Sequence, residues 1–192
     1  QLGQFKIKTT SSNNAIKIDS IKTNNPQGES IITGQWLGAN PNQPELTQLK
    51  INMDIKNAGQ IIAHWSSEKS VEGGQGKVNA SVQWSGSPFN PQLDSLKGKA
   101  DLHLIKGRLL EVDTSGAQIL DVLSLQSLFK FATLDLPGTV GNIVTKGTTF
   151  NSIAGVFDIE NGIAQTTQFS MDLDQARVAM NGQINIPKQT QD

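Results

Sequence analysis

Cysteine is absent from the 192-residue sequence, and several other features that mark common protein classes are missing with it. Without cysteine, thiol catalysis and cysteine-based metal sites are excluded, although the redox state of the compartment stays undecided. No apolar run approaches the roughly 18 residues that a membrane-spanning helix needs. Lys and Arg number 16 against 17 Asp and Glu, and they do not gather into the basic stripe of a nucleic-acid-binding protein.

The sequence also lacks the signatures of common enzyme classes. It contains no Gly-x-Ser-x-Gly, His-Glu-x-x-His or Walker pattern. His64 and His103 are the only histidines and stand far apart in sequence, so we expect structural roles for both. Asp172 and Asp174 flank an expected turn beside Arg177, where solvated carboxylates are common. The sequence therefore predicts a protein that is not an enzyme and holds no cofactor or metal.

The abundant residue types favour β-structure. Gly, Asn, Gln, Ser and Thr are plentiful, and charged residues make up 17% of the chain. This composition suits exposed strand faces and tight turns better than helix bundles, which are rich in Glu, Lys and Ala. The chain begins with Gln1 rather than Met, which predicts a fragment or a processed product.

Alternation of apolar and polar residues recurs along the chain with a period of two. It is clear over 49–56, 78–84 and 100–104, and each segment predicts a strand with one apolar and one wet face. In the last third, strands over 153–159, 169–173 and 178–186 are separated by turns at 160–162 and 174–175, which is the pattern of a meander. Apolar pairs before residue 40 predict two or three further strands.

Two segments interrupt the strands with helical patterns. Asn57 and Gln60 resemble a helix cap, and we expect this first helix to end at Gly73-Gly74, with Gly73–Gly76 forming a turn. The second pattern runs from Ser115 to about 133, with a break expected near residue 124. This second segment is very apolar, which favours a helix pair that plugs the end of the sheet, or alternatively a lid that contacts lipid. The residues that we assign to this lid or plug are Leu120, Leu123, Leu128 and Phe129.

Three stretches resemble a known family. They are GGQGKVNASVQWSGSP at 73–88, a Gly-x-Leu strand followed by a Leu-rich segment at 96–128, and a Gly-rich closing meander at 147–186. In this order and spacing the sequence resembles the C-terminal region of the AsmA-like proteins of Gram-negative bacteria, and among them the YhdP type. Residues 1–72 match more loosely, through the rhythm of strands and helix and the Gly34-Gln35-Trp36 element.

The resemblance implies a fold and a function. The expected fold is mainly β, a curved antiparallel meander that forms a groove, with two or three short amphipathic helices. Residues 1–192 would form one C-terminal groove fragment, with N-terminal strands and the first helix in 1–72 and the best-matched region in 73–186. Its implied function is transport of phospholipid between inner and outer membranes by the periplasmic portion of a protein anchored in the inner membrane, in support of outer-membrane lipid homeostasis.

The implied partners are phospholipid acyl chains, and at the C-terminal end an outer-membrane or periplasmic protein, with no nucleic acid. The candidate groove residues are Val78, Ala80, Val82, Ala100, Leu102, Leu104, Phe157, Ile159, Phe169, Met171, Val178, Met180 and Ile184. Alternation alone fits a filled β-sandwich equally well. The alternative is therefore a closed β-domain that acts as a periplasmic scaffold or as a protein- or glycan-binding module, with its functional patch in loops such as 40–44 or 85–91.

Overall fold

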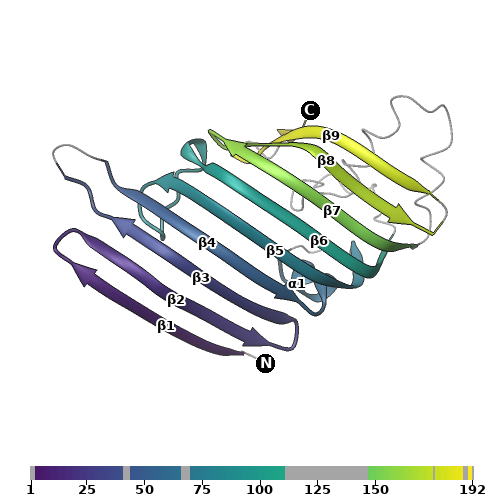
Figure 1. The fold of residues 1–192 in the computed structure, drawn as a ribbon, viewed down its shortest axis with the longest axis horizontal. Helices are drawn as coiled ribbons and strands as arrows, with labels where there is room; N and C mark the ends of the chain where they lie inside the picture. Colours follow the sequence, from purple (N-terminus) through teal and green to yellow (C-terminus); the bar gives the residue numbers. More distant parts are fainter. Residues whose placement is uncertain are drawn as a thin grey trace.

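A computed structural model describes residues 3–40, 44–65, 70–110, 147–174, 176–187 and 190–191. These residues form one antiparallel sheet of ten strands, each paired with the next along the chain (Figure 1). The strands are β1 (Gln4–Ser12), β2 (Ala15–Asn25), β3 (Gly28–Leu37), β4 (Leu46–Ile55), β5 (Val71–Ser85), β6 (Lys97–Leu109), β7 (Thr148–Glu160), β8 (Ile163–Leu173), β9 (Arg177–Asn185) and β10 (Thr190–Gln191). The predicted meander is confirmed, and the N-terminal segment contains three strands.

One α-helix, α1 (Ala58–Trp65), and one short 3-10 helix, η1 (Leu93–Ser95), are present in the part of the chain that the structure describes. The side-chain oxygen Oδ1 of Asn57 accepts a hydrogen bond from the backbone N–H of Gln60 at 3.0 Å, which confirms the predicted cap. The second predicted helical segment, with Leu120, Leu123, Leu128 and Phe129, lies outside the described residues. Within the described ranges, no helix has the length and apolar character needed to cross a bilayer.

The predicted turn at Gly73–Gly76 is wrong. Helix α1 ends at Trp65, and Gly73 and Gly74 lie inside β5 with φ angles of 66° and 79°. Lys106 on the neighbouring strand also has a positive φ, of 56°, and the strand pairing passes from Gly73↔Gly107 to Gln75↔Ile105. The two glycines therefore permit an irregularity within a continuing strand rather than a reversal of the chain.

The turn between β7 and β8 is as predicted. Asn161 and Gly162 have φ angles of 50° and 75°, and Glu160 pairs directly with Ile163. A two-residue hairpin loop with positive φ at both positions favours Asn-Gly, because these residues enter the left-handed region at least cost. This turn sets the register where β8 begins, and the register shifts again between Val156 and Asp158 and between Phe150 and Ser152.

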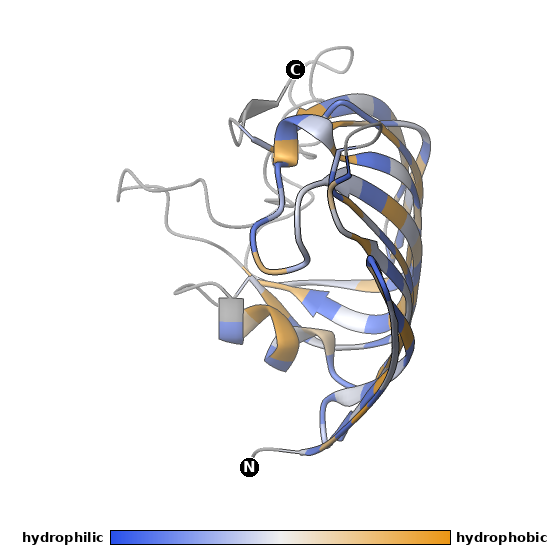
Figure 2. Cartoon of the chain, turned by 90° about the vertical axis from the view of Figure 1, so that its left-hand side faces the viewer, coloured by the Kyte–Doolittle hydropathy of each residue, from blue (hydrophilic) through white to orange (hydrophobic). Residues whose placement is uncertain are grey.

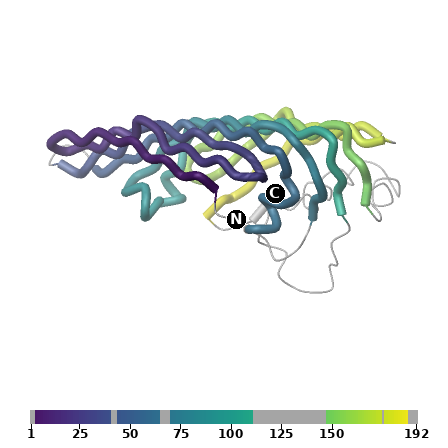
Figure 3. The backbone as a smooth tube through the Cα atoms, turned by 90° about the horizontal axis from the view of Figure 1, so that it is seen from below, coloured from purple at the N-terminus to yellow at the C-terminus, as the bar shows by residue number. Residues whose placement is uncertain are grey.

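The sheet is curved, and α1 lies on its concave side (Figure 2). Seen along another axis, α1 and the chain between β5 and β6 project from the same side of the sheet (Figure 3). Ala58, Ile61 and Ile62 of α1 pack in one cluster with sheet residues such as Met53 and Val78. We call the concave face that carries these residues the inner face, and the convex face the outer face.

Candidate functional site

An unbroken cross-strand row runs over the inner face from β1 to β9. Each member pairs directly with the next, and the row is Phe5, Thr23, Ser30, Met53, Val78, Leu102, Gly155, Phe169 and Met180. A second row runs beside it from β1 to β7, formed by Ile7, Ile21, Ile32, Ile51, Ala80, Ala100 and Phe157. These two rows are therefore apolar across the strands, apart from Thr23 and Ser30, whose hydroxyl oxygens lie 2.7 Å apart.

All thirteen groove residues predicted from the sequence lie on this inner face, as their pairings show. Four of them are buried: Leu104, Phe169, Met171 and Val178. The other nine are partly accessible: Val78, Ala80, Val82, Ala100, Leu102, Phe157, Ile159, Met180 and Ile184. Met171 is 0% exposed, so a charge there would disrupt the core, and the partly accessible positions are better sites for tests of binding.

The N-terminal half of the inner face was not among the predicted site residues. It adds Phe5 and Ile7, with exposed fractions of 62% and 55%, and partly buried residues such as Ile21, Ile32 and Ile51. The alternation that places these side chains was visible in the sequence. The predicted groove residues begin at Val78 because the resemblance to the family is strongest beyond residue 72.

Exposure of the inner face falls from β1 toward β8. Phe5 on β1 is 62% exposed, whereas Ile153 on β7 and Phe169 on β8 are 2% exposed. Most of the buried apolar residues form one cluster that includes Phe150, Ile153, Phe169, Met171 and Leu173 and reaches Ala58 of α1. One end of the sheet thus has a packed core, while the N-terminal strands present apolar side chains to the surroundings.

Glycines on the inner face leave room for aromatic rings. A Cβ added at Gly155 would lie 2.8 Å from the ring of Phe169 and 2.9 Å from the ring of Phe157. These two rings meet at a tilt of 59°, with their centroids 6.4 Å apart. Gly107 similarly faces the ring of Phe150. The glycines therefore let bulky rings lie close to the sheet.

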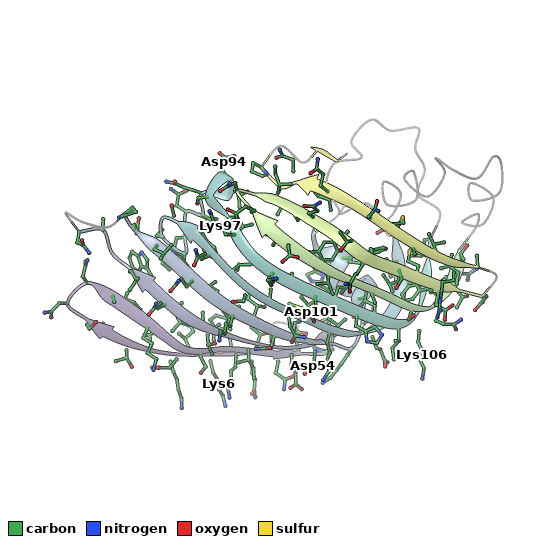
Figure 4. The ribbon with its side chains drawn as sticks, turned by 45° about the horizontal axis from the view of Figure 1, so that its top comes forward. Lys6, Asp54, Asp94, Lys97, Asp101 and Lys106 are labelled. Atoms are coloured by element: carbon green, nitrogen blue, oxygen red, sulfur yellow. The ribbon has the colours of Figure 1, made fainter. Side chains whose placement is uncertain are left out.

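The outer face has the opposite character. Ion pairs link neighbouring strands, with Lys77 Nζ 3.5 Å from Asp54 Oδ1 and Lys99 Nζ 2.7 Å from Asp158 Oδ1. Labelled charges lie on several strands in Figure 4, among them Lys6 on β1, Asp54 on β4 and Asp101 on β6. Because charged and amide side chains occupy this face, the outer face is suited to water.

One outer carboxyl has a perturbed pKa. The hydroxyl of Thr10 donates a hydrogen bond to Asp19 Oδ2 at 2.7 Å, and Lys17 Nζ lies 3.2 Å from Asp19 Oδ1. These contacts, with Thr10 contributing most, lower the pKa of Asp19 below its ordinary value. Asp19 therefore stays ionised at neutral pH, as expected for a surface carboxylate.

A pocket of about 170 Å³ lies between α1 and strands β2 to β4. Its lining mixes apolar side chains with hydrogen-bonding groups: Thr23, Asn25, Gln27, Gly28, Glu29, Ser30, Met53, Gln60, Ile61 and His64. Apolar side chains of the sheet and of α1 therefore meet polar groups in this pocket.

Two tryptophans share the inner face. Trp36 on β3 and Trp84 on β5 both pair with Thr47 on β4. The indole N–H of Trp36 donates to Glu45 Oε1 at 2.7 Å, and that of Trp84 donates to the Ser87 carbonyl at 3.0 Å. Their polar atoms are satisfied, which fits packing roles for both.

The two histidines lie on different elements and faces. His64 is on α1, with its ring Nδ1 3.1 Å from the Gln60 carbonyl oxygen, and His103 is exposed on the outer face of β6. No group of three or more His, Cys, Asp or Glu side chains with metal-binding geometry occurs among the described residues. The distinctive feature of the structure is thus its extended apolar face.

Comparison with known proteins finds a matching family and a similar protein. The family model described as YhdP protein matches residues 1–192. The chain is 27% identical over 154 residues to a protein of Escherichia coli (strain K12) named intermembrane phospholipid transporter YhdP. The match covers 80% of this chain and 12% of that relative. No solved structure matches the chain.

Proposed function

The chain belongs to the YhdP family, and from this premise we propose that its inner face carries the acyl chains of phospholipids without chemical conversion. The family match confirms the resemblance found in residues 73–186 and extends over residues 1–72 as well. The name of the Escherichia coli relative supports phospholipid as the cargo.

The observation that carries the proposal is the continuous cross-strand row from Phe5 on β1 to Met180 on β9, which is apolar apart from Thr23 and Ser30. With neighbouring strands about 4.8 Å apart, nine strands extend the row to roughly 38 Å. One leaflet of a bilayer has a hydrocarbon thickness of about 15 Å, half that of the bilayer core. The inner face is therefore long enough for a whole acyl chain to lie on it and to move from strand to strand.

Such a face addresses the main energetic barrier to lipid transfer through water. A two-chain phospholipid carries about thirty methylenes, and exposing them costs on the order of 20 kcal/mol at ~0.8 kcal/mol each. An apolar lining lowers this cost along the path and needs no reacting group. The mixed pocket beside α1 suits the boundary between an acyl chain and its polar headgroup, which stays in water.

The cellular location and partners that we propose also follow from membership of the YhdP family. Residues 1–192 act as one groove unit in the periplasmic portion of an inner-membrane-anchored protein that moves phospholipid between inner and outer membranes. This transport supports outer-membrane lipid homeostasis. An outer-membrane or periplasmic protein binds the C-terminal end of the chain. The alternative of a closed scaffold domain gains no support from the described strands, because they form one sheet whose first and last strands are not paired with each other.

A matched pair of substitutions on β6 tests the proposal in cells. Leu102→Asp puts a carboxylate on the partly buried inner face, and His103→Asp puts the same group on the exposed outer face one residue away. In the full-length protein, we expect the first variant to reduce transfer of pulse-labelled phospholipid between the two membranes at least tenfold and the second to leave it unchanged. Equal transfer by both variants, at equal protein level and with intact folding, would contradict the proposal.

A further inference from the structure

The chain between β5 and β6 carries the most exposed large apolar side chain among the described residues. Phe89 is 91% exposed, and Leu93 at the start of η1 is 39% exposed. We call residues 86–95 the bracket loop. Almost the whole side chain of Phe89 is therefore available for contact with a ligand or partner.

Hydrogen bonds fix the bracket loop to the sheet. The Gly86 N–H donates to the Glu45 carbonyl at 3.0 Å, and the Gln92 N–H donates to the Ser85 carbonyl at 3.3 Å. The hydroxyl of Ser95 donates to the Gln92 carbonyl at 2.7 Å and accepts from the Ser85 N–H at 2.8 Å. Both ends of the loop are therefore anchored, so the position of its tip is set by the sheet.

Within the loop, further contacts restrict the tip itself. The Asn90 N–H donates to the Ser87 carbonyl at 3.2 Å, and the same carbonyl accepts from the Trp84 indole at 3.0 Å. Pro88 and Pro91 flank the tip, and each fixes its own φ angle. Phe89 is thus presented by a short, braced segment.

The bracket loop folds over the inner face. Thr47 and Trp84, both on that face, are 0% and 8% exposed, and the Thr47 hydroxyl donates to the Gly86 carbonyl at 2.7 Å. Figures 2 and 3 show the loop on the same side of the sheet as α1. Since α1 joins β4 to β5 and the bracket loop joins β5 to β6, the two elements lie at opposite ends of β5 and approach the inner face from opposite rims.

We propose that Phe89 is an acyl-chain contact, and that the bracket loop holds lipid against the inner face from the rim opposite α1. Residues 85–93 carry no charge and Asp94 is acidic, so the loop lacks the Lys and Arg that attract an anionic membrane surface. A single aromatic side chain also offers far less area than a protein interface requires. A hydrocarbon chain lying on the neighbouring inner face needs no charge and only a small apolar contact.

This inference rests on the proposed function, and photocrosslinking tests the two separately. The photoreactive residue p-benzoylphenylalanine is placed at Phe89, at Leu102 on the inner face, or at His103 on the outer face of the full-length protein in cells labelled with radioactive phosphate. After irradiation and purification, we expect labelled phospholipid on the protein crosslinked at positions 89 and 102, and none at position 103.

Other crosslinking results distinguish a failure of the Phe89 contact from a failure of the proposed function. Lipid at position 102 with none at position 89, or a protein adduct at position 89, overturns the role of Phe89 and leaves the proposed function standing. Absence of lipid at both positions overturns the proposed function and this inference together.

A second measurement uses the natural side chain. With the photoreactive residue at position 102, Phe89→Ser should lower the lipid crosslinked there about fivefold, the loss expected when roughly 40 Å² of apolar contact is removed. Phe89→Leu keeps an apolar side chain and should retain most of the signal. Equal lipid yields from the Ser and Leu variants would overturn the contact, because Phe89 is exposed and neither change disturbs a packed core.

Discussion

At the scale of single residues, the inner face depends on the absence of side chains as much as on their presence. Gly155 pairs with Leu102 on one side and Phe169 on the other, and the rings of Phe157 and Phe169 occupy the space where its Cβ would be. The ring of Phe150 uses Gly107 in the same way. These glycines leave the space that the rings of Phe150, Phe157 and Phe169 need to pack close to the sheet.

Substitution of Gly155 tests this packing. Gly155→Ala places a methyl group less than 3.0 Å from two ring atoms, and overpacking of this kind typically costs about 1–3 kcal/mol. We expect the free energy of unfolding, measured by urea denaturation followed by circular dichroism, to fall by that amount. Ala154→Ser on the outer face is the control and should change it by less than about 0.5 kcal/mol. An unchanged Gly155→Ala protein would show that the rings move aside freely.

At the scale of elements, the alternation of the sequence predicts the strands well, because one face of each strand is apolar and the other is wet. The Asn161-Gly162 turn was equally readable, since both residues favour positive φ. The predicted turn at Gly73-Gly74 was wrong because a positive φ at glycine is compatible both with a turn and with an irregularity within a strand. Only the pairing of Gly73 with Gly107 and of Gln75 with Ile105 distinguishes the two, and that pairing is not local in sequence.

The candidate site was predicted only in part, for a related reason. Parity along a strand shows that Val78 and Leu102 each belong to an apolar face, but not that these faces join across nine strands. The exposed fraction of a side chain depends on which other residues pack against it. Met171 is 0% exposed and Phe89 is 91% exposed, and their neighbours in sequence do not predict this difference. The buried core and the exposed loop tip emerge from tertiary structure.

Helix α1 offers a prediction at this scale. Asn57→Ala removes the oxygen that accepts the Gln60 N–H, and loss of such a cap typically costs about 1 kcal/mol. Because Ala58 of α1 belongs to the buried cluster, we expect this loss to appear in the global unfolding transition measured by urea denaturation. Asn57→Asp keeps an acceptor oxygen and should preserve most of the stability. Equal losses in the two variants would contradict a capping role.

At the scale of the whole molecule, the two faces of the sheet differ in polarity and in their contribution to stability. The outer face bears exposed ion pairs, and the side chains of Lys99 and Asp158 remain 78% and 68% exposed although their charged atoms lie 2.7 Å apart. The inner face carries the apolar surface and the packed cluster. Stability should therefore come mainly from the inner face.

The ion pairs of the outer face give a direct test of that division. Lys99→Ala should change the free energy of unfolding by less than about 1 kcal/mol, because exposed pairs are weak and screened by salt. Urea denaturation of this variant and of the unchanged protein, at about 0.1 and 1 M NaCl, provides the measurement. A loss of several kcal/mol at low salt that disappears at high salt would show that the outer charges hold the sheet together.

The central claim is that the inner face binds acyl chains along its whole length, including the N-terminal strands. The most direct measurement is mass spectrometry of the phospholipid that co-purifies with the chain from bacterial cells, in three forms: unchanged, Ile51→Asp on the inner face of β4, and Asn52→Asp on its outer face. We predict bound phospholipid on the unchanged protein and on Asn52→Asp, and at least a tenfold reduction on Ile51→Asp with the fold intact. A stable protein that carries no phospholipid, or equal amounts on both variants, would contradict the claim.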